Sequence, residues 1–495
     1  MINFKKITKR LTNKITQMPR MVIAGLLGVV LLYVSASGLI SVTHPFFTGT
    51  NGDTMAHVDM IYRIYNGDLP KASDGIRYQP FIDLGGGNVY QRASGHPPLF
   101  HILHAPIVGP LLNAGEWQKA IALGRALNIF FGILCIFALA WAGWLFGGKR
   151  KALFAVAVPA LAVLTYRFSR LNTDYALDGL LTLWTTLTLI CLYKILQNGL
   201  RANYLIFLTL LSVAGMSTKI SYVVFLGISV LVVIIANYLH GNQGTRKNVI
   251  RGTAIAAGIM VVVVVLIGWY YYFQNYRASG SLVTPIQANL APNRPYQSYR
   301  DILTSSNFWA LLYARYSVNI VVSTIITSFT IAGYFSMKKG NLAKLKKNLM
   351  TKWTILLMCS AFLGILATQL MLAHPNGSIN FRYLLPAILP ISLFLAYGLL
   401  EFKWLRGQLV ALAAIAMAGT TILSIRLAQA PDGLLQGVKL WGKTVDKIYT
   451  VTTKNGVPSY VTTTLFLMFA IGALLLSVGL YHLSKTQQSN SKKPA

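Results

Sequence analysis

Residues 252–274 read GTAIAAGIMVVVVVLIGWYYYFQ, a run without a single Asp, Glu, Lys or Arg. A helix of about 20 residues rises about 30 Å, the thickness of the hydrocarbon core of a bilayer. This run therefore predicts a transmembrane helix. Similar runs recur on both sides of it, over residues 21–42, 123–146, 152–168, 175–196, 203–218, 220–239, 317–336, 353–372, 383–400, 408–426 and 461–483. The sequence thus predicts an all-α integral membrane protein with about 12 transmembrane helices.

The composition excludes several other classes of protein. Hydrophobic residues make up 55% of the chain and charged residues only 11%, whereas soluble domains carry about 25% charged residues. A soluble enzyme, a disordered chain and a disulfide scaffold are therefore excluded. The net charge of +32 resembles that of nucleic-acid-binding proteins. Because the basic residues lie between the apolar runs, they indicate membrane orientation instead, and we expect membrane lipids but no nucleic acid as partners.

The basic residues also predict the topology. With a cytoplasmic N-terminus, 25 of the 44 Lys and Arg residues fall in short cytoplasmic segments, as the positive-inside rule requires. Residues 1–20 and 485–495 are then basic or polar cytoplasmic tails, and residues 21–484 form one membrane domain in the cytoplasmic membrane. The external loops are 43–122, 275–316 and 427–460. The first is the largest, and its proline-broken apolar stretch 97–112 is expected to be an interfacial or re-entrant segment.

Carboxylates are scarce, and their positions are informative. Five of the 12 acidic residues lie between residues 53 and 83, in the first external loop. Asp53 follows the turn signal Asn51-Gly52, so a helix is expected to start there, with Asp53 and His57 on one face at i and i+4. Such a pair can position a carboxylate and tune its pKa. A helix cap with a solvated histidine remains the alternative, and Asp59 is expected to be solvated or paired with Arg63.

A second acidic pair, Asp174 and Asp178, lies at the outer mouth of a predicted span. A carboxylate at the centre of a span costs about 2.5–3.5 kcal/mol, so such groups usually face a cavity or a cationic partner. The available partners are Arg167, Arg170 and Lys219. A buried ion pair that only fixes helix packing is the alternative interpretation.

Arg382 lies at the outer end of another span, where it could hold a phosphate through two parallel hydrogen bonds. Snorkelling of this arginine to lipid head groups is the alternative. Three histidines at 96, 101 and 104 have no carboxylate at a fixed spacing, so they are expected to be interfacial rather than metal ligands. Each of the three cysteines lies in an apolar run and is expected to pack there.

Several short strings occur in an order typical of one family. They are Asp53-Thr54-Met55-Ala56-His57, Gly67-Asp68-Leu69-Pro70, His96-Pro97-Pro98-Leu99, Arg125 at the start of the second span, Asp174, Gly215-Met216-Ser217-Thr218-Lys219 and Arg382-Tyr383-Leu384-Leu385-Pro386. In these strings the chain resembles the polytopic glycosyltransferases of the GT-C fold, such as protein O-mannosyltransferases and the lipid A aminoarabinose transferase. Two departures are Thr54, where relatives carry Glu, and the lack of the large external C-terminal domain of some relatives.

The resemblance implies a hexosyl- or pentosyltransferase, inverting at the sugar, with its active site at the outer face of the membrane. Its donor would be a polyprenyl-phosphate sugar and its acceptor a hydroxyl of a glycan, lipid or protein. The implied catalytic residues are Asp53, as general base, His57 and Asp174; the implied substrate- or phosphate-binding residues are Lys219, Arg382, Tyr383, Arg125 and His96. No metal site is expected, although a divalent cation is left open as a cofactor. A lipid-linked-saccharide flippase or transporter, and an oligosaccharide ligase or polymerase, are the alternatives.

Overall fold

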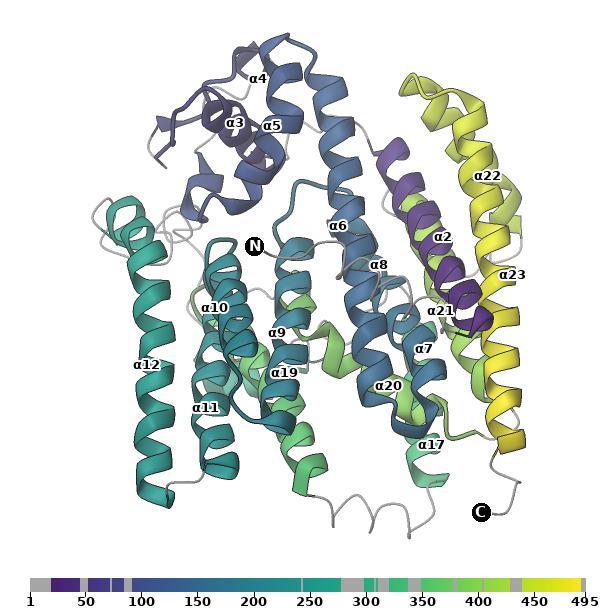
Figure 1. The fold of residues 1–495 in the computed structure, drawn as a ribbon. Helices are drawn as coiled ribbons and strands as arrows, with labels where there is room; N and C mark the ends of the chain where they lie inside the picture. The colour runs from purple at the N-terminus through teal and green to yellow at the C-terminus, as the bar shows by residue number, and fades with distance from the viewer. Residues whose placement is uncertain are drawn as a thin grey trace, which may run out of the picture.

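The computed structural model describes residues 19–44, 52–71, 74–83, 91–241, 244–276, 298–306, 309, 320–336, 349–376, 381–402, 405–427 and 439–490, and the regular elements within these ranges are helices (Figure 1). Seven helical segments are long and apolar enough to cross a membrane. They are α2 (Arg20–Thr43), α6 (Trp117–Phe146), α9 (Asp178–Asn198), η5 (Ile220–Tyr222) with α11 (Val223–His240), α12 (Thr245–Tyr270), α19 (Leu349–Asn376) and α23 (Ser459–Asn490).

Shorter helices fill the remaining predicted spans. They are α7 (Lys151–Val163), α10 (Ala202–Met216), α17 (Ile320–Ser336), η7 (Phe381–Ala387) with α20 (Ile388–Leu399), and α21 (Arg406–Leu427). Every predicted apolar run thus contains a helix, which confirms the all-α membrane class, while the number of spans stays a prediction. The run 152–168 differs most from expectation, because α7 ends at Val163 and a separate short helix, α8 (Tyr166–Leu171), follows.

The two ends of the described chain pack against each other through glycine. Helices α2 and α23, purple and yellow in Figure 1, run side by side. A Cβ atom on Gly28 of α2 would lie 2.5 Å from the backbone nitrogen of Leu476 and 2.8 Å from the carbonyl oxygen of Gly472 on α23. Since real Cβ atoms never come so close, these helices approach backbone to backbone, as small residues allow in membranes.

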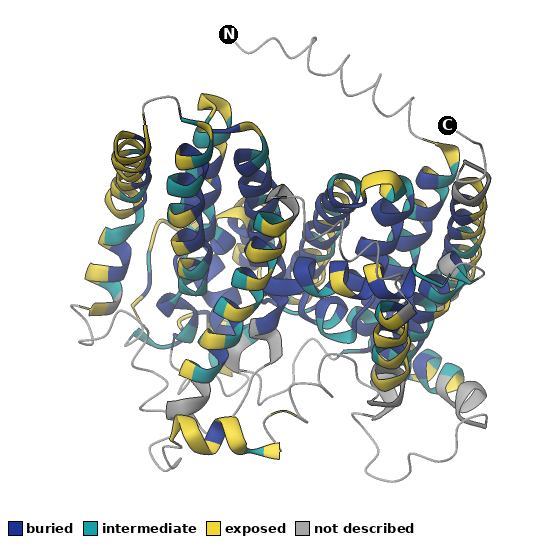
Figure 2. Cartoon of the chain, turned by 90° about the horizontal axis from the view of Figure 1, so that it is seen from below, coloured by how far each residue is buried: buried dark blue, intermediate teal, exposed yellow. Residues whose placement is uncertain are grey.

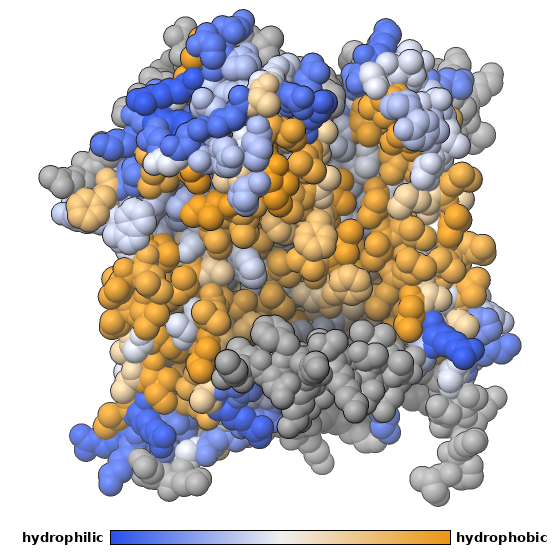
Figure 3. Space-filling model, turned by 45° about the horizontal axis from the view of Figure 1, so that its top comes forward, coloured by the Kyte–Doolittle hydropathy of each residue, from blue (hydrophilic) through white to orange (hydrophobic). Residues whose placement is uncertain are grey.

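The outer surface is apolar where a bilayer would surround it. Figure 3 shows an apolar band between a hydrophilic upper end and a hydrophilic lower end. Large apolar side chains on α12, among them Val261, Val264 and Val265, are exposed. Buried residues lie on the inward sides of the helices in Figure 2, and exposed ones on the outward sides. This distribution is typical of a helix bundle whose outer face contacts lipid acyl chains.

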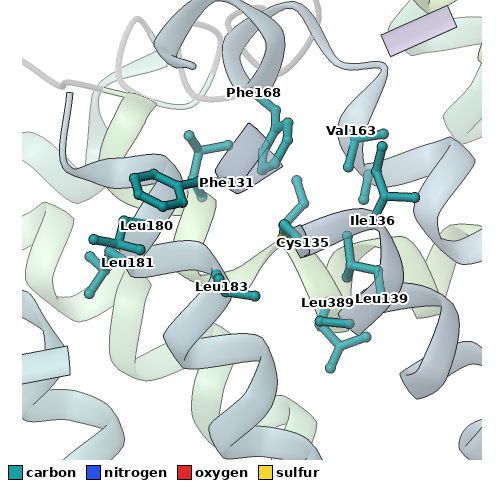
Figure 4. Close-up of a cluster of buried hydrophobic side chains, with 14 of the residues drawn as sticks. Phe131, Cys135, Ile136, Leu139, Val163, Phe168, Leu180, Leu181, Leu183 and Leu389 are labelled. Atoms are coloured by element: carbon teal, nitrogen blue, oxygen red, sulfur yellow. The ribbon is translucent and has the colours of Figure 1, made fainter. Parts of the chain in front are cut away.

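A tightly packed apolar cluster joins five helices (Figure 4). It fixes α6, which carries Arg125 and Asn128 in its N-terminal half, against α9, which begins at Asp178. The labelled members come from α6, α7, α8, α9 and α20: Phe131, Cys135, Ile136, Leu139, Val163, Phe168, Leu180, Leu181, Leu183 and Leu389. Cys135 and Cys191 are buried and Cys359 is exposed on α19, and all three are free thiols.

The first predicted external loop forms a helical layer at the upper end of Figure 1. It contains α3 (Gly52–Tyr65), α4 (Gln79–Asp83), η3 (Arg92–Gly95) and α5 (Leu99–Asn113). A turn follows the first of these helices, with Gly67 at a φ of +80°, a conformation that glycine adopts without a steric penalty. Helix α5 packs on α3 and on the N-terminal half of α6. This layer carries the predicted site residues Asp53, His57 and His96.

Candidate functional site

Helix α3 carries the first predicted pair. Because it begins at Gly52, Asp53 and His57 are at i and i+4 of one helix, as expected; the side chain of Asp53 lies outside the described residues. The side chain of His57 is buried, with 8% of the residue exposed, so the alternative of a solvated histidine is wrong. Its Nδ1 lies 2.9 Å from Nε2 of His101, and its ring stacks on that of His96 at 6.5 Å between centroids.

Asp59 corrects one prediction. It is fully buried, and its Oδ1 accepts hydrogen bonds from the backbone N–H groups of Arg77 and Tyr78, both at 2.8 Å. Its Oδ2 accepts a further bond from the side chain of Gln91. The expectation that Asp59 is solvated or paired with Arg63 is wrong, because three donors distant in sequence, at residues 77, 78 and 91, surround the carboxylate. Burial raises the pKa of Asp59, although these hydrogen bonds and Arg63 act in the opposite direction.

The other described acidic residues of this loop also have structural partners. Arg63 is buried and pairs with Asp68 at 2.6 Å and Asp74 at 2.9 Å. Asp83 accepts a hydrogen bond from Gln79 at 2.7 Å. The accumulation of carboxylates in the first loop therefore largely serves its folding. Of the five acidic residues between positions 53 and 83, only Asp53 has a side chain that lies outside the described residues.

Asp174 lies just before α9, in a group of charged side chains. Its Oδ2 is 3.9 Å from Nε of Arg170, one of the predicted partners. Arg170 also donates to Nε2 of His44 at 2.9 Å, at the end of α2. The backbone carbonyl of Asp174 accepts a hydrogen bond from Nδ2 of Asn128 on α6 at 2.8 Å. Sequence analysis missed Asn128, because a lone amide inside an apolar run carries no signal of its own.

Arg125 has a different position from the one expected. Helix α6 begins at Trp117, so Arg125 lies about two turns inside it rather than at its start. The residue is buried. Its guanidinium donates to the carbonyl oxygens of Ser41 at 3.0 Å and His44 at 3.3 Å. These bonds satisfy backbone groups at the C-terminal end of α2, where a helix leaves its last carbonyls without internal partners.

Lys219 pairs with a predicted partner. Its Nζ lies 2.7 Å from Oδ1 of Asp178, the first residue of α9, and both side chains are buried. The nearby Ser217 carbonyl accepts a hydrogen bond from the backbone N–H of Leu99, the first residue of α5, at 3.2 Å. The segment that carries Lys219 therefore meets the start of α5, which lies between His96 and His101 in the sequence.

Two tyrosines connect the end of α12 to the segments that precede α5 and Lys219. Tyr270 lies with its hydroxyl 2.6 Å from the carbonyl oxygens of both Ser94 and His96. Tyr271, at the start of the π-helical segment η6 (Tyr271–Tyr276), donates to the carbonyl of Met216 at 2.9 Å. Such π-helical turns occur frequently at functional sites. The structure thus brings His57, His96 and Lys219 to the first turns of α5.

Arg382 and Tyr383 fall within η7, and their side chains lie outside the described residues. The same segment packs on α9, since Thr185 donates to the carbonyl of Pro386 at 3.1 Å. Among the described residues, no group of three or more His, Cys, Asp and Glu side chains is arranged to hold a metal ion. The described histidines 57, 96 and 101 contact one another through their rings instead.

No protein-family model matches the sequence, and no curated protein matches it in sequence. The fold is similar to that of ArnT from Cupriavidus metallidurans bound to undecaprenyl phosphate, with a TM-score of 0.51 and 15% identity over 94% of this chain and 77% of that chain. The same protein in the apo state gives a TM-score of 0.49 and 14% identity over 91% and 75%.

An archaeal oligosaccharyltransferase, AglB from Archaeoglobus fulgidus in complex with an inhibitory peptide and a dolichol-phosphate, gives a TM-score of 0.42 and 14% identity over 93% of this chain and 56% of that chain. The likeness to the undecaprenyl-phosphate-bound ArnT structure, at a TM-score of 0.51, shows that this chain has the GT-C fold that the sequence resemblance implies.

Proposed function

We propose that this protein transfers a sugar from a polyprenyl-phosphate donor to an acceptor hydroxyl at the outer face of the cytoplasmic membrane. The observation that supports this function best is the meeting of three segments around α5. His57 on α3 contacts α5 directly. The carbonyl of Ser217, two residues before Lys219, accepts a hydrogen bond from the first backbone N–H of α5, and Asn128 joins His104 of α5 to the backbone of Asp174. A fold shared with a protein bound to undecaprenyl phosphate supports a lipid-phosphate donor.

In this proposal the acceptor oxygen attacks the anomeric carbon and the bond from that carbon to the phosphate oxygen breaks. Asp53 takes the proton of the acceptor hydroxyl as general base, and the polyprenyl phosphate leaves with the electron pair. Attack from the side opposite the phosphate inverts the anomeric carbon. The acceptor is a glycan, a lipid or a protein, and the sugar is a hexose or a pentose.

The cationic groups in this proposal stabilise charge that develops on the leaving phosphate. Arg382 supplies two parallel donors from η7, with Tyr383 beside it. Lys219 adds a positive charge whose position Asp178 fixes, and His96 and Arg125 border the donor site. Asp174 orients the sugar together with Arg170. No step requires a nucleotide, and a divalent cation remains open as a cofactor.

The experiment is a donor panel with the purified protein in nanodiscs. Synthetic short-chain polyprenyl phosphates carrying different hexoses and pentoses are incubated with the protein and candidate acceptors. Mass spectrometry then measures the free polyprenyl phosphate and the glycosylated acceptor. Sugar release with at least one donor supports the proposal.

The alternatives give other results in the same system. A flippase moves an intact donor across a proteoliposome membrane without releasing polyprenyl phosphate. A ligase or polymerase consumes oligosaccharide donors but not those with a single sugar. Either of these outcomes contradicts the proposed reaction.

A further inference from the structure

His101 is a buried histidine that the proposed mechanism does not use. It lies on the first turn of α5, and none of its surface is exposed. Its Nε2 is 2.9 Å from Nδ1 of His57, and the two ring planes are within 19° of parallel, with 5.1 Å between centroids, so the rings meet through these nitrogens. Within the described part of the chain, its other nitrogen, Nδ1, is buried and has no hydrogen-bond partner.

These contacts determine where the protons sit. A contact of 2.9 Å between two ring nitrogens requires that one donates and the other accepts. A proton on Nδ1 of His101 would be a buried donor without an acceptor, which costs about 1–3 kcal/mol. The proton of His101 therefore belongs on Nε2, where it is donated to Nδ1 of His57. A neutral His57 then carries its own proton on Nε2.

We infer that His101 is a positioning residue that fixes the tautomer and the ring orientation of His57. This inference rests on the proposed function in one respect, namely that His57 serves the carboxylate of Asp53. Asp53 and His57 are at i and i+4 of α3, on one face of the helix. In this tautomer Nε2–H is the group through which His57 donates a hydrogen bond.

Helix α5 is anchored by hydrogen bonds on both sides of His101, and these bonds fix the position of the His101 ring. At its first residue, Leu99 donates its backbone N–H to Ser217. One turn further along, Nε2 of His104 lies 3.1 Å from Oδ1 of Asn128, whose Nδ2 donates to the backbone carbonyl of Asp174. A group held by such neighbours keeps its geometry through the reaction, and displacement by about 1 Å can cost a hundredfold in rate.

The first test is spectroscopic and needs no substrate. Ring nitrogen and carbon shifts of His57, measured by solid-state NMR on histidine-labelled protein in lipid, distinguish the two neutral tautomers and the cation. We expect the Nε2–H tautomer of His57 in the wild type, and a through-bond coupling between its Nδ1 and Nε2 of His101. A wild-type His57 protonated on Nδ1, or on both nitrogens, overturns the inference.

Two substitutions at residue 101 separate hydrogen bonding from packing. His101→Gln keeps a side-chain N–H near the position of Nε2 and should keep the tautomer of His57. His101→Leu fills a similar volume without a donor and should give a mixture of tautomers. The control is Ile102→Ala, an exposed position beside His101 on α5, which should not change the His57 signals. Unchanged His57 signals in His101→Leu contradict the inference.

The second readout is kinetic. In His101→Leu, kcat should fall on the order of ten- to a hundredfold with KM nearly unchanged, and His101→Gln should restore most of the loss. Equal losses in both variants contradict a positioning role. If the wild type transfers no sugar from any donor, the proposed function fails, while the NMR result still decides whether His101 sets the tautomer of His57. If neither variant folds, the coupling between Nδ1 of His57 and Nε2 of His101 in the wild type still decides whether His101 sets the tautomer of His57.

Discussion

The Nζ of Lys219 lies 2.7 Å from Oδ1 of Asp178, and 5% and 2% of the two residues are exposed. The pair joins the segment after α10 to the start of α9, close to the first turn of α5. Removing one partner of a buried ion pair leaves an uncompensated charge, whereas replacing both by apolar groups is often neutral. This asymmetry allows the two interpretations of Lys219, a packing role and a role at the phosphate, to be separated.

We predict that Lys219→Met and Asp178→Leu each lower the free energy of unfolding by about 3–5 kcal/mol, and that the double variant recovers most of this loss. Transfer should stay low in the double variant, because the positive charge at the leaving phosphate is still missing. Thermal unfolding in detergent and sugar release are measured on the same samples. Full activity in the stable double variant would assign the pair to packing alone.

A second prediction concerns Asp59, which organises the external layer. In Asp59→Asn, Oδ1 can still accept from Arg77 and Tyr78, but Nδ2 faces the donor group of Gln91. Two opposed donors should lower stability by about 1–3 kcal/mol. Asp83→Asn is the matched control, because Asp83 is exposed and accepts one bond that an amide oxygen can also accept. Limited proteolysis of the loop and thermal unfolding should show a loss in Asp59→Asn only.

Burial raises the pKa of Asp59. The difference in stability between wild type and Asp59→Asn should therefore depend on pH. The folded protein binds this proton more tightly than the unfolded chain, whose carboxyl titrates near 3.8. Between 3.8 and the higher folded value, stability from this group therefore rises as the pH falls. Wild type should gain stability relative to Asp59→Asn when the pH is lowered from 7 toward 4. A difference that is constant, or that changes in the opposite direction, contradicts this assignment.

The topology can be tested at the two ends of one helix. Lys119 near the start of α6 and Lys149 just after its end are both exposed. In a background without native cysteines, Lys119→Cys should react with a membrane-impermeant maleimide on intact cells, and Lys149→Cys only after permeabilisation. The reason is the excess of basic residues in the segments assigned to the cytoplasm. Labelling of Lys149→Cys in intact cells would reverse the orientation.

Arg382 supplies a prediction that tests the phosphate site. The guanidinium of Arg382 would present two parallel donors and a positive charge to a phosphate. Arg382→Lys removes the paired donors but keeps the charge, and Arg382→Ala removes both. We therefore expect the apparent affinity for a short-chain polyprenyl-phosphate sugar to fall in Arg382→Lys and to fall much further in Arg382→Ala. Neither change should unfold the protein. If lysine substitutes fully, snorkelling to lipid head groups explains the arginine, and the phosphate site lies elsewhere.

Much of the fold was predictable, because long apolar runs indicate directly which segments lie within the bilayer. Each predicted run contains a helix, and the pairing of Asp178 with Lys219 follows from the cost of an isolated charge in a span. The break between α7 and α8 was missed because the apolar run continues past Val163, the last residue of α7, through Leu164. Residues 153–163 are buried by neighbouring helices, and burial in protein gives the same pattern as contact with lipid.

The candidate site was harder to predict, because its geometry depends on how the first loop folds. Helix periodicity placed Asp53 and His57 on one face, but could not show that His101 would cover His57. The misassignment of Asp59 has the same origin, since its partners Arg77, Tyr78 and Gln91 are 18 to 32 residues away in the sequence. Long-range contacts of this kind leave no local pattern.

The central claim is that Asp53 acts as the general base of sugar transfer, and Asp53→Asn tests it most directly. Asparagine caps a helix about as well as aspartate, so folding should change little, whereas loss of a general base typically costs a hundredfold or more in rate. The measurement is the rate of sugar transfer from the preferred polyprenyl-phosphate donor by wild type and variant of equal thermal stability. A fall of about a hundredfold or more is predicted, and a rate equal to that of the wild type would remove Asp53 from the mechanism.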